Sequence, residues 1–318
     1  MKVLITGIAG FIGSHVAEKL NSLGHNVIGI DNFSDYYSVS LKKKNAETLS
    51  NQGIKVISLD LCIDNIAQAL PSDIDYIFHF AAQPGISKHS TFEDYLTNNI
   101  YATKNLLNYI LRYTIPKMFV NIGTSSIYGL HATCAEHEDP KPISNYGVTK
   151  LAAEQLVLSK ARLGELKACS LRLYSVYGSR ERPDKLFTKL IDAGMHNRKF
   201  PLYEGSLNHL RSFTHITDIV NGIISVMGKE KVCNKEVFNI GTEAEYSTKE
   251  GIETVEKLLN THIDFDILPP RLGDQKRTNA NINKARKLLG YDPKISLEEG
   301  LKEQIAWYKK SILLFKNS

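Results

Sequence analysis

A tyrosine and a lysine four positions apart, Tyr146 and Lys150, carry the first chemical signal in this sequence. On a helix this spacing brings both side chains to one face. A phenol with a pKa of about 10 is a poor base at neutral pH, but a neighbouring ammonium and a positively charged nicotinamide ring both favour the phenolate. The pair therefore predicts a tyrosine base assisted by a lysine. Outside a cofactor site, the same spacing would be an ordinary surface pair.

Three consecutive hydroxyl side chains, Thr124, Ser125 and Ser126, follow the apolar run 118–122. Hydroxyls at the carboxyl end of a parallel strand point into the cofactor crevice of a dinucleotide-binding fold. We therefore expect Thr124 to bond a substrate hydroxyl and to help pass its proton to Tyr146, with Ser125 and Ser126 completing the catalytic set. The alternative is a serine- and threonine-rich turn that bonds only its own backbone.

Gly7, Gly10 and Gly13 form a G-x-x-G-x-x-G pattern between an apolar run and a helical segment. Gly7 would permit the tight turn, Gly10 the approach of backbone to a pyrophosphate, and Gly13 close packing of the helix, whose N-terminus faces the phosphates. Because the pattern opens a βαβ unit, it is better evidence for a dinucleotide site than glycine spacing alone.

Asp31 ends the second apolar run, 24 residues after Gly7. A carboxylate there can accept hydrogen bonds from the ribose of NAD and would repel the 2′-phosphate of NADP, so NAD is the expected cofactor. The alternative role is to cap the junction of strand and loop. Asp60 could likewise hold the adenine amino group or simply begin a loop. His79 lies inside an apolar run and is expected to be a core histidine with bonded ring nitrogens.

The elements that must position these side chains alternate between strand and helix. Near-continuous apolar runs predict buried parallel strands at 3–6, 27–30, 56–59, 76–81, 118–122 and 168–173. Helical periodicity between them predicts helices at 12–23, 40–49, 92–113 and 146–163. Repeated βα units predict an α/β fold of the Rossmann type, a doubly wound parallel sheet.

The segments shorten after about residue 174, which predicts a smaller, mixed α/β C-terminal domain. Its expected helices are 184–196, 217–227, 248–259 and 295–310, and its expected strands are 200–203, 237–240 and 263–268. We expect a cofactor-binding domain at 1–174, joined by part of 212–242, and a substrate domain at 175–318.

Composition excludes several other classes of protein. The 318 residues include 39 Lys+Arg and 34 Asp+Glu, and the densest basic run, 42–44, is interpreted as one solvated helical turn rather than a nucleic-acid site. No apolar run approaches the roughly 20 residues of a membrane span. Four scattered cysteines fit a reducing cytosol, so a cytoplasmic protein without a metal site is expected.

Taken in order, these motifs resemble the extended short-chain dehydrogenase/reductase family, and within it the nucleotide-sugar epimerases and dehydratases. The resemblance runs nearly end to end and rests on the segments 6–15, 79–83, 124–129, 146–150, 171–172, 176–178, 211–214 with Asp218, 271–274 and 287–293. It implies a UDP-sugar or dTDP-sugar substrate held by the C-terminal domain, and a homodimer formed through helices 92–113 and 146–163.

The resemblance also implies a fuller set of site residues, which includes those derived above. For NAD they are Gly7, Gly10, Phe11, Ile12, Gly13, Asp31, Asn32, Asp60, Leu61, Phe80, Ala81, Ala82, Gln83, Asn99, Tyr146 and Lys150. For the sugar nucleotide they are Pro84, Thr124, Ser125, Ser175, Arg182, Tyr203, Arg211, Arg271 and Asp274. Arg211 and Arg271 match positions that neutralise the pyrophosphate, a suitable role for guanidinium groups.

The type of reaction that the resemblance implies depends on two carboxylates that this chain lacks at positions 125 and 126. Related dehydratases carry Thr-Asp-Glu where this chain has Thr124-Ser125-Ser126, so the resemblance implies a UDP-sugar 4-epimerase that oxidises C4 and reduces it again from the other face. The segment 178–184, with Arg182, is similar to that of UDP-glucuronate 4-epimerases, which implies interconversion of UDP-glucuronate and UDP-galacturonate. Many of those enzymes have Arg in place of Ser87. A UDP-N-acetylhexosamine or UDP-glucose 4-epimerase, or a dehydratase, decarboxylase or reductase, remains the alternative.

Overall fold

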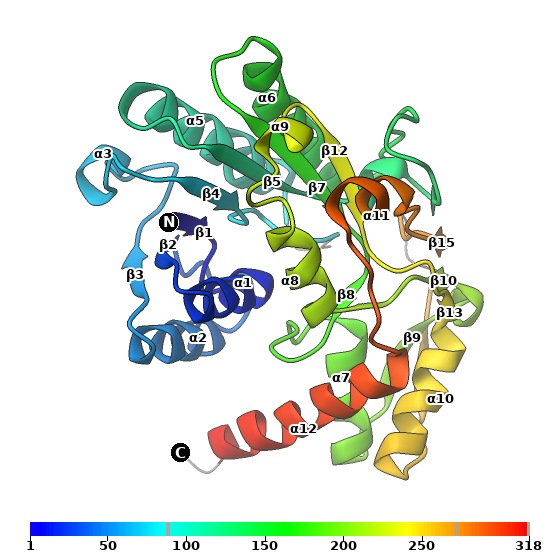
Figure 1. The fold of residues 1–318 in the computed structure, drawn as a ribbon. Helices are drawn as coiled ribbons and strands as arrows, with labels where there is room; N and C mark the ends of the chain where they lie inside the picture. Colours follow the sequence, from blue (N-terminus) through cyan, green and yellow to red (C-terminus); the bar gives the residue numbers. More distant parts are fainter. Residues whose placement is uncertain (87–89, 271–272, 317–318) are drawn as a thin grey trace.

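The centre of the computed structural model, which describes residues 1–86, 90–270 and 273–316, is a seven-stranded parallel sheet (Figure 1). In spatial order its strands are β3 (Lys55–Ser58), β2 (Asn26–Asp31), β1 (Lys2–Thr6), β4 (Tyr76–His79), β5 (Met118–Thr124), β7 (Ala168–Leu173) and β12 (Val237–Ile240). The direction of winding reverses between β1 and β4. A crevice at such a switch point is where open α/β sheets bind ligands.

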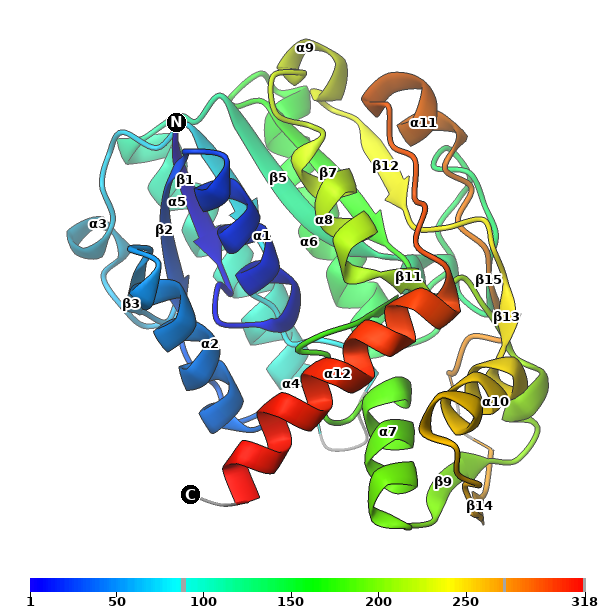
Figure 2. The same cartoon turned by 60° about the horizontal axis from the view of Figure 1, so that its bottom comes forward.

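Helices cover both faces of this sheet, as Figures 1 and 2 show. On one face lie α1 (Phe11–Ser22), α2 (Val39–Asn51) and α8 (Ile216–Ile224); on the other lie α5 (Ala102–Tyr113) and α6 (Asn145–Arg162). Successive β1 residues supply the two cores: Val3 and Ile5 pack with α1 and α8, and Leu4 packs with α5 and α6. The doubly wound Rossmann-type sheet is confirmed.

A smaller group of elements lies beyond the end of β7. Its core joins α7 (Leu186–His196), α10 (Thr248–Leu259) and α12 (Leu297–Lys316) to the short parallel pair β9 (Phe200–Tyr203) and β14 (Phe265–Leu268) (Figure 2). The remaining short strands are β6 (His131–Ala132), β8 (Val176–Tyr177), β10 (Leu210–Arg211), β11 (Thr214–His215), β13 (Tyr246–Ser247) and β15 (Arg277–Thr278). Further short helices are α3 (Ile66–Ala69), α9 (Glu230–Cys233) and α11 (Asn283–Leu289).

The chain returns to the large sheet after entering this smaller group. The helix α8 packs on α1, and β12 forms the edge of the sheet beside β7. The sequence elements of the two regions are therefore interleaved, although their cores are separate.

The predicted helix 92–113 is not a single α-helix. A capping box at Thr91 and Asp94 begins the one-turn helix α4 (Phe92–Tyr95), and a π-helical segment (Leu96–Tyr101) separates it from α5. The wider turn carries Asn99, which is completely buried. Segments of this kind are frequent at functional sites, and periodicity does not reveal them.

Candidate active site

A cavity of about 1080 Å³ opens at the carboxyl ends of the central strands and continues into the smaller group of elements. Its lining includes every residue predicted for the cofactor and sugar sites except Asn99 and Arg271, and Arg271 lies outside the described residues. From the large sheet come Gly7, Gly10, Phe11, Ile12, Gly13, Asp31, Asn32, Asp60, Leu61, Phe80, Ala81, Ala82, Gln83, Pro84, Thr124, Ser125, Ser126, Tyr146 and Lys150. From the chain after β7 come Ser175, Arg182, Tyr203, Arg211 and Asp274.

The glycine turn after β1 leaves no room for side chains. Gly7 has a φ of 71°, and a Cβ there would lie 2.8 Å from the backbone nitrogen of Ala81. A Cβ on Gly13 would lie 2.4 Å from the carbonyl oxygen of Gly7, so this glycine lets α1 begin directly against the turn. The first turn of α1 contains no acidic residue. An open helix N-terminus beside bare backbone fits the pyrophosphate of a dinucleotide.

Asp31 caps a junction of strand and loop, one of the two roles considered for it from the sequence, and it also lies at the cavity where the other role would be possible. Its side chain is 7% exposed and accepts hydrogen bonds from the backbone nitrogens of Ala9 (3.0 Å) and Phe33 (2.9 Å), so it caps the end of β2. It also lines the cavity, where burial raises the pKa of its carboxyl group despite these hydrogen bonds. Asp60 likewise lines the cavity while accepting hydrogen bonds from Asn32 and the backbone nitrogen of Cys62.

A lysine missed by the sequence interpretation lies near Asp31. Lys42 was expected to be solvated, but it is 5% exposed, and its Nζ donates to the backbone oxygen of Ser34 at 2.7 Å. It also lies 4.5 Å from the centre of the Tyr37 ring and lines the cavity. That interpretation was wrong for Lys42 because the preceding loop folds over the helix. The Tyr36-Tyr37 pair before the helix was the available signal.

The hydroxyl-bearing turn and the tyrosine meet at the end of β5. The Thr124 hydroxyl caps the short 3-10 turn 125–128 by accepting from the backbone nitrogen of Ser126 at 3.2 Å, and it lines the cavity together with Tyr146. Burial raises the pKa of Tyr146, whereas interaction with the Thr124 hydroxyl and the nearby Arg182 charge act in the opposite direction. Lys150 is 5% exposed, and burial lowers its pKa to about 8.

Local sequence explains why α6 delivers this pair so close to the turn. The Ser144 side chain accepts from the backbone nitrogen of Gly147 at 3.1 Å and so caps the start of the helix. A Cβ on Gly147 would lie 2.7 Å from the carbonyl oxygen of Ser126, a contact that only glycine avoids. The glycine between Tyr146 and Lys150 therefore sets the distance between helix and turn.

Asn99 supports the site from behind the cavity. Its Oδ1 accepts from the backbone nitrogen of Gln83 at 2.8 Å, and its Nδ2 donates to the Thr149 hydroxyl at 2.9 Å. The side chain thus joins the loop after β4 to α6. His79 is the core histidine expected from the sequence: its ring nitrogens contact the hydroxyls of Thr6 (2.7 Å) and Thr103 (2.9 Å).

Arg182 approaches the tyrosine from the loop 178–185. Its guanidinium is 5.3 Å from the centre of the Tyr36 ring and forms two hydrogen bonds to the Asp184 carboxylate, at 2.9 and 2.8 Å. Although burial opposes the effect, these bonds and the guanidinium charge lower the pKa of Asp184 to about 2. The site therefore holds a cation whose charge is already matched by its neighbour.

The far end of the cavity is lined from the later elements. Arg211 contacts Asp274 at 3.4 Å, and burial lowers the pKa of the guanidinium. Gln275, which the sequence did not indicate, donates to the backbone oxygens of Ser125 (3.2 Å) and Gly129 (3.0 Å). Gln275 thereby fixes the position of the turn that carries the hydroxyl side chains.

Among residues 1–86, 90–270 and 273–316, no three His, Cys, Asp or Glu side chains gather closely enough to hold a metal ion. Of the helices in these same ranges, none combines the length and the apolar character required to cross a membrane.

Comparison with known proteins agrees with this geometry. Residues 3–241 match the model of the NAD dependent epimerase/dehydratase family. The chain belongs to this family. Membership identifies an NAD-dependent enzyme, and the glycine turn and Asp31 fit that cofactor.

Individual relatives match the chain nearly from end to end. An uncharacterized UDP-glucose epimerase of Bacillus subtilis is 36% identical, over 96% of this chain and 98% of its own. A probable UDP-glucuronate 4-epimerase of Rhizobium meliloti is 31% identical over 98% of each. The crystal structure of the UDP-glucuronic acid 4-epimerase of Bacillus cereus with UDP-glucuronic acid and NAD superimposes with a TM-score of 0.92 at 34% identity, covering 98% and 99% of the two chains.

Proposed function

We propose that this protein is an NAD-dependent UDP-sugar 4-epimerase that interconverts UDP-glucuronate and UDP-galacturonate. The observation that carries the proposal is the placement of Thr124 and Tyr146 together at the cavity wall beside the buried Lys150, at the switch point of a dinucleotide-binding sheet. Serines at 125 and 126 favour epimerisation, because loss of water from the sugar requires an additional acid and base there. The B. cereus and R. meliloti relatives support the choice of sugar.

In the proposed mechanism Tyr146 removes the proton of the sugar C4 hydroxyl, and Thr124 bonds the same hydroxyl and orients it. Lys150 stabilises the phenolate with its positive charge. NAD, when bound, accepts the C4 hydride and later returns it. The 4-keto sugar would turn over between these steps, so that the hydride would return to the opposite face of C4 while Tyr146 gives its proton back to the C4 oxygen. The cavity of about 1080 Å³ is large enough for both cofactor and sugar nucleotide.

We further propose that residues 1–174, with part of 212–242, bind NAD and that 175–318 bind the nucleotide portion of the substrate. Arg211 is suited to the pyrophosphate because its partly buried guanidinium lies at the cavity wall beside a carboxylate that orients it. Tyr203 would flank the base. Arg271 would add a second positive charge, and Ser175 and Pro84 would contact the sugar.

A specific contact supports a second candidate, a UDP-glucose 4-epimerase. Arg182 lines the cavity and its charge acts on Tyr146, but the guanidinium is already bonded twice to Asp184. A uronate carboxylate would have to share or replace that partner, whereas a neutral hexose would not. The B. subtilis relative agrees with this candidate.

The test is to incubate the purified protein with UDP-glucuronate, UDP-glucose and UDP-N-acetylglucosamine separately and to separate the products. Conversion of UDP-glucuronate to UDP-galacturonate without net formation of NADH would support the main proposal. Preferential conversion of UDP-glucose would support the second candidate. A released 4-keto product, carbon dioxide, or consumption of added NADH would exclude both.

We also propose that the protein is a cytoplasmic homodimer. Residues with large apolar side chains on the outer surfaces of α4, the π-helical segment and α6 are 42–47% exposed, namely Phe92, Tyr101 and Val148. Burial against the same helices of a second copy would remove this surface from water. All four cysteines are free thiols, which agrees with a reducing compartment.

A further inference from the structure

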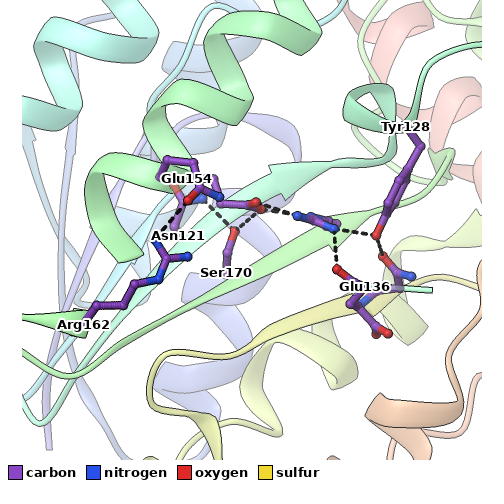
Figure 3. Close-up of polar contacts among 9 residues, drawn as sticks. Asn121, Tyr128, Glu136, Glu154, Arg162 and Ser170 are labelled. Atoms are coloured by element: carbon purple, nitrogen blue, oxygen red, sulfur yellow. Dashed lines mark hydrogen bonds and ion pairs between the residues drawn. The ribbon is translucent and has the colours of Figure 1, made fainter. Parts of the chain in front are cut away.

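A buried polar network lies directly behind the catalytic side chains, and its centre is Arg172 on β7. The guanidinium is 3% exposed and forms two hydrogen bonds with the carboxylate of Glu154, at 3.1 Å from Nε and 2.7 Å from one terminal nitrogen. Its other terminal nitrogen donates to the Tyr128 hydroxyl at 2.6 Å (Figure 3). Glu154 and Tyr128 are themselves 1% and 5% exposed, so the network is closed to solvent.

The two partners of Arg172 belong to the two elements that carry the catalytic groups. Glu154 follows Lys150 by four residues and Tyr146 by eight, so all three lie along one face of α6. Tyr128 is the last residue of the 3-10 turn that begins after Thr124. One guanidinium therefore connects the helix that bears the base to the turn that bears its hydroxyl partner.

Further contacts tie this connection to the sheet. Ser170 donates to Glu154 at 2.9 Å and accepts from Asn121 on β5 at 2.8 Å (Figure 3), while Tyr128 donates to Asn239 on β12 at 2.9 Å. A Cβ on Gly123, the residue before Thr124, would lie 3.3 Å from the Arg172 Cγ and 3.3 Å from a Glu154 carboxylate oxygen. Arg172 and Glu154 thus pack against the backbone that holds Thr124.

We propose that Arg172, Glu154 and Tyr128 are positioning residues that hold Tyr146 and Thr124 next to one another and keep an anion next to Lys150. The proposal rests on the proposed function in one respect, that Tyr146 is the base. Neither Arg172 nor Glu154 lines the cavity, so their effect must pass through the helix and the turn.

The charges around Tyr146 determine in which direction loss of Glu154 should change the pKa of the tyrosine. Glu154 raises the pKa of Lys150 against the lowering effect of burial, and thereby preserves the positive charge that favours the Tyr146 phenolate. The other titratable groups facing Tyr146 and Lys150 are Arg182 and Tyr95, which act on Tyr146, and the buried His79. Burial and the Lys150 charge lower the pKa of His79 to about 3. Glu136 contributes its backbone oxygen to Arg172 at 3.3 Å.

If Arg172 and Glu154 served only to stabilise the fold, their replacement would change stability without changing the titration of Tyr146. Replacing both members of a buried ion pair by apolar residues of similar volume often leaves stability unchanged or raises it, whereas removing one member is strongly destabilising. The double variant Glu154→Leu/Arg172→Met therefore separates positioning from folding. Tyr128→Phe cuts the link to the turn but leaves the ion pair intact. Arg162→Met is the matched control, because Arg162 lies on α6 but is exposed and bonds only Gln155 within the described hydrogen bonds.

The experiment uses the NAD-loaded protein. The titration of Tyr146 is measured as the ultraviolet phenolate signal of each variant minus that of the same variant carrying Tyr146→Phe, with thermal unfolding recorded in parallel. Both test variants are expected to raise the midpoint of this titration, by about one pH unit in the double variant. Epimerisation should show a kcat reduced about tenfold or more with KM changed less than threefold. Arg162→Met should match the parent protein in every measurement.

An unchanged Tyr146 midpoint in a folded Tyr128→Phe variant and an unchanged midpoint in the folded double variant would overturn the proposal. If the double variant does not fold, Tyr128→Phe alone decides. A parent protein that converts no UDP-sugar would refute the proposed function, whereas the phenolate titration would still test this inference because it requires no substrate.

Discussion

At the scale of single residues, the site is defined by how burial acts on Tyr146 and Lys150. Burial alone opposes the phenolate and the ammonium alike. The Thr124 hydroxyl and the Arg182 charge partly offset the effect of burial on Tyr146, and the anion at Glu154 partly offsets it on Lys150; a nicotinamide cation would further favour the phenolate. The base is therefore expected to become competent only when the cofactor is bound, which would limit proton transfer in the empty protein.

Tyr146→Phe should reduce kcat at least 100-fold, because a positioned acid–base group contributes about 10²–10⁴ in rate. The ring remains, so the variant should retain its NAD, as measured by the nucleotide released on denaturation. Tyr109→Phe is the control: it also removes one hydroxyl, which bonds the Pro71 backbone at 2.8 Å outside the cavity lining. Comparable loss of rate in both variants would contradict the assignment of Tyr146 as the base.

Asp184→Asn should increase the preference of the enzyme for UDP-glucuronate over UDP-glucose. The change removes the negative charge that Arg182 now contacts at 2.8–2.9 Å and leaves the guanidinium free to bind a sugar carboxylate. We expect the ratio of the two kcat/KM values to rise about tenfold, equivalent to about 1.4 kcal/mol. A fall in this ratio would mean that Arg182 does not face the substituent at C5.

At the scale of elements, the loop 178–185 is held between the two regions of the molecule. On one side Arg180, at a φ of 67°, donates to the Ser14 hydroxyl (3.1 Å) and to Glu18 (2.7 Å) on α1. On the other side the Glu181 carboxylate accepts from Thr188 on α7 and from Gln304 on α12, at 3.0 and 2.8 Å. Arg182 is thereby presented to the site from a loop fixed at both flanks.

Glu181→Gln should stabilise the protein at pH 8 but not at pH 4. Burial raises the pKa of Glu181 to about 7, so between pH 4.5 and 7 the folded protein binds more protons at this residue than the unfolded chain does. Its contribution to the free energy of unfolding therefore falls as the pH rises through this window. At pH 8 the folded protein must bury an ionised Glu181 carboxylate, and replacing it by glutamine should raise the free energy of unfolding by about 3 kcal/mol.

Urea unfolding of both proteins across this pH range measures the effect. Glu253→Gln on the exposed surface of α10, where the glutamate side chain is 56% exposed, is the control and should give a small, constant difference. If Glu181→Gln raised the free energy of unfolding equally at pH 4 and pH 8, the charge of Glu181 would not be the cause of the stabilisation.

The extent of successful prediction also differs among elements. The parallel strands, the glycine turn and the Tyr146–Lys150 helix were predictable because apolar runs, glycine spacing and helical periodicity are local. The π-helical segment at Asn99 was not, because its partners Gln83 and Thr149 are distant in sequence. Lys42 was misassigned for a related reason: its burial depends on a loop folding over it, which charge alone does not indicate.

At the scale of the whole molecule, the proposed dimer can be tested without the active site. The parent protein should have about twice the 35.6 kDa mass of one chain by light scattering. Val148→Glu, which places a charge on an apolar side chain 45% exposed on α6, should yield monomers with little change in thermal stability. A monomeric parent protein would remove the proposal, and so would a Val148→Glu dimer of undiminished stability to dilution.

Acid should destabilise the molecule through His79. Burial and the Lys150 charge lower its pKa from 6.5 to about 3, so the unfolded chain binds the additional proton as the pH falls below 6.5. The free energy of unfolding should therefore decline by about 1.4 kcal/mol per pH unit from this group. His79→Gln should lose that slope between pH 6 and pH 4 in urea unfolding, and an identical slope in both proteins would contradict the account.

The position of β12 has a consequence for how such enzymes diversify. This strand lies far along the chain, yet it completes the edge of the central sheet against β7, and α8 just before it packs on α1. A chimera joined once near residue 174 would place a foreign strand and a foreign helix on the native sheet. New sugar preferences are therefore more accessible through substitutions in loops such as 178–185 than through recombination of whole C-terminal halves.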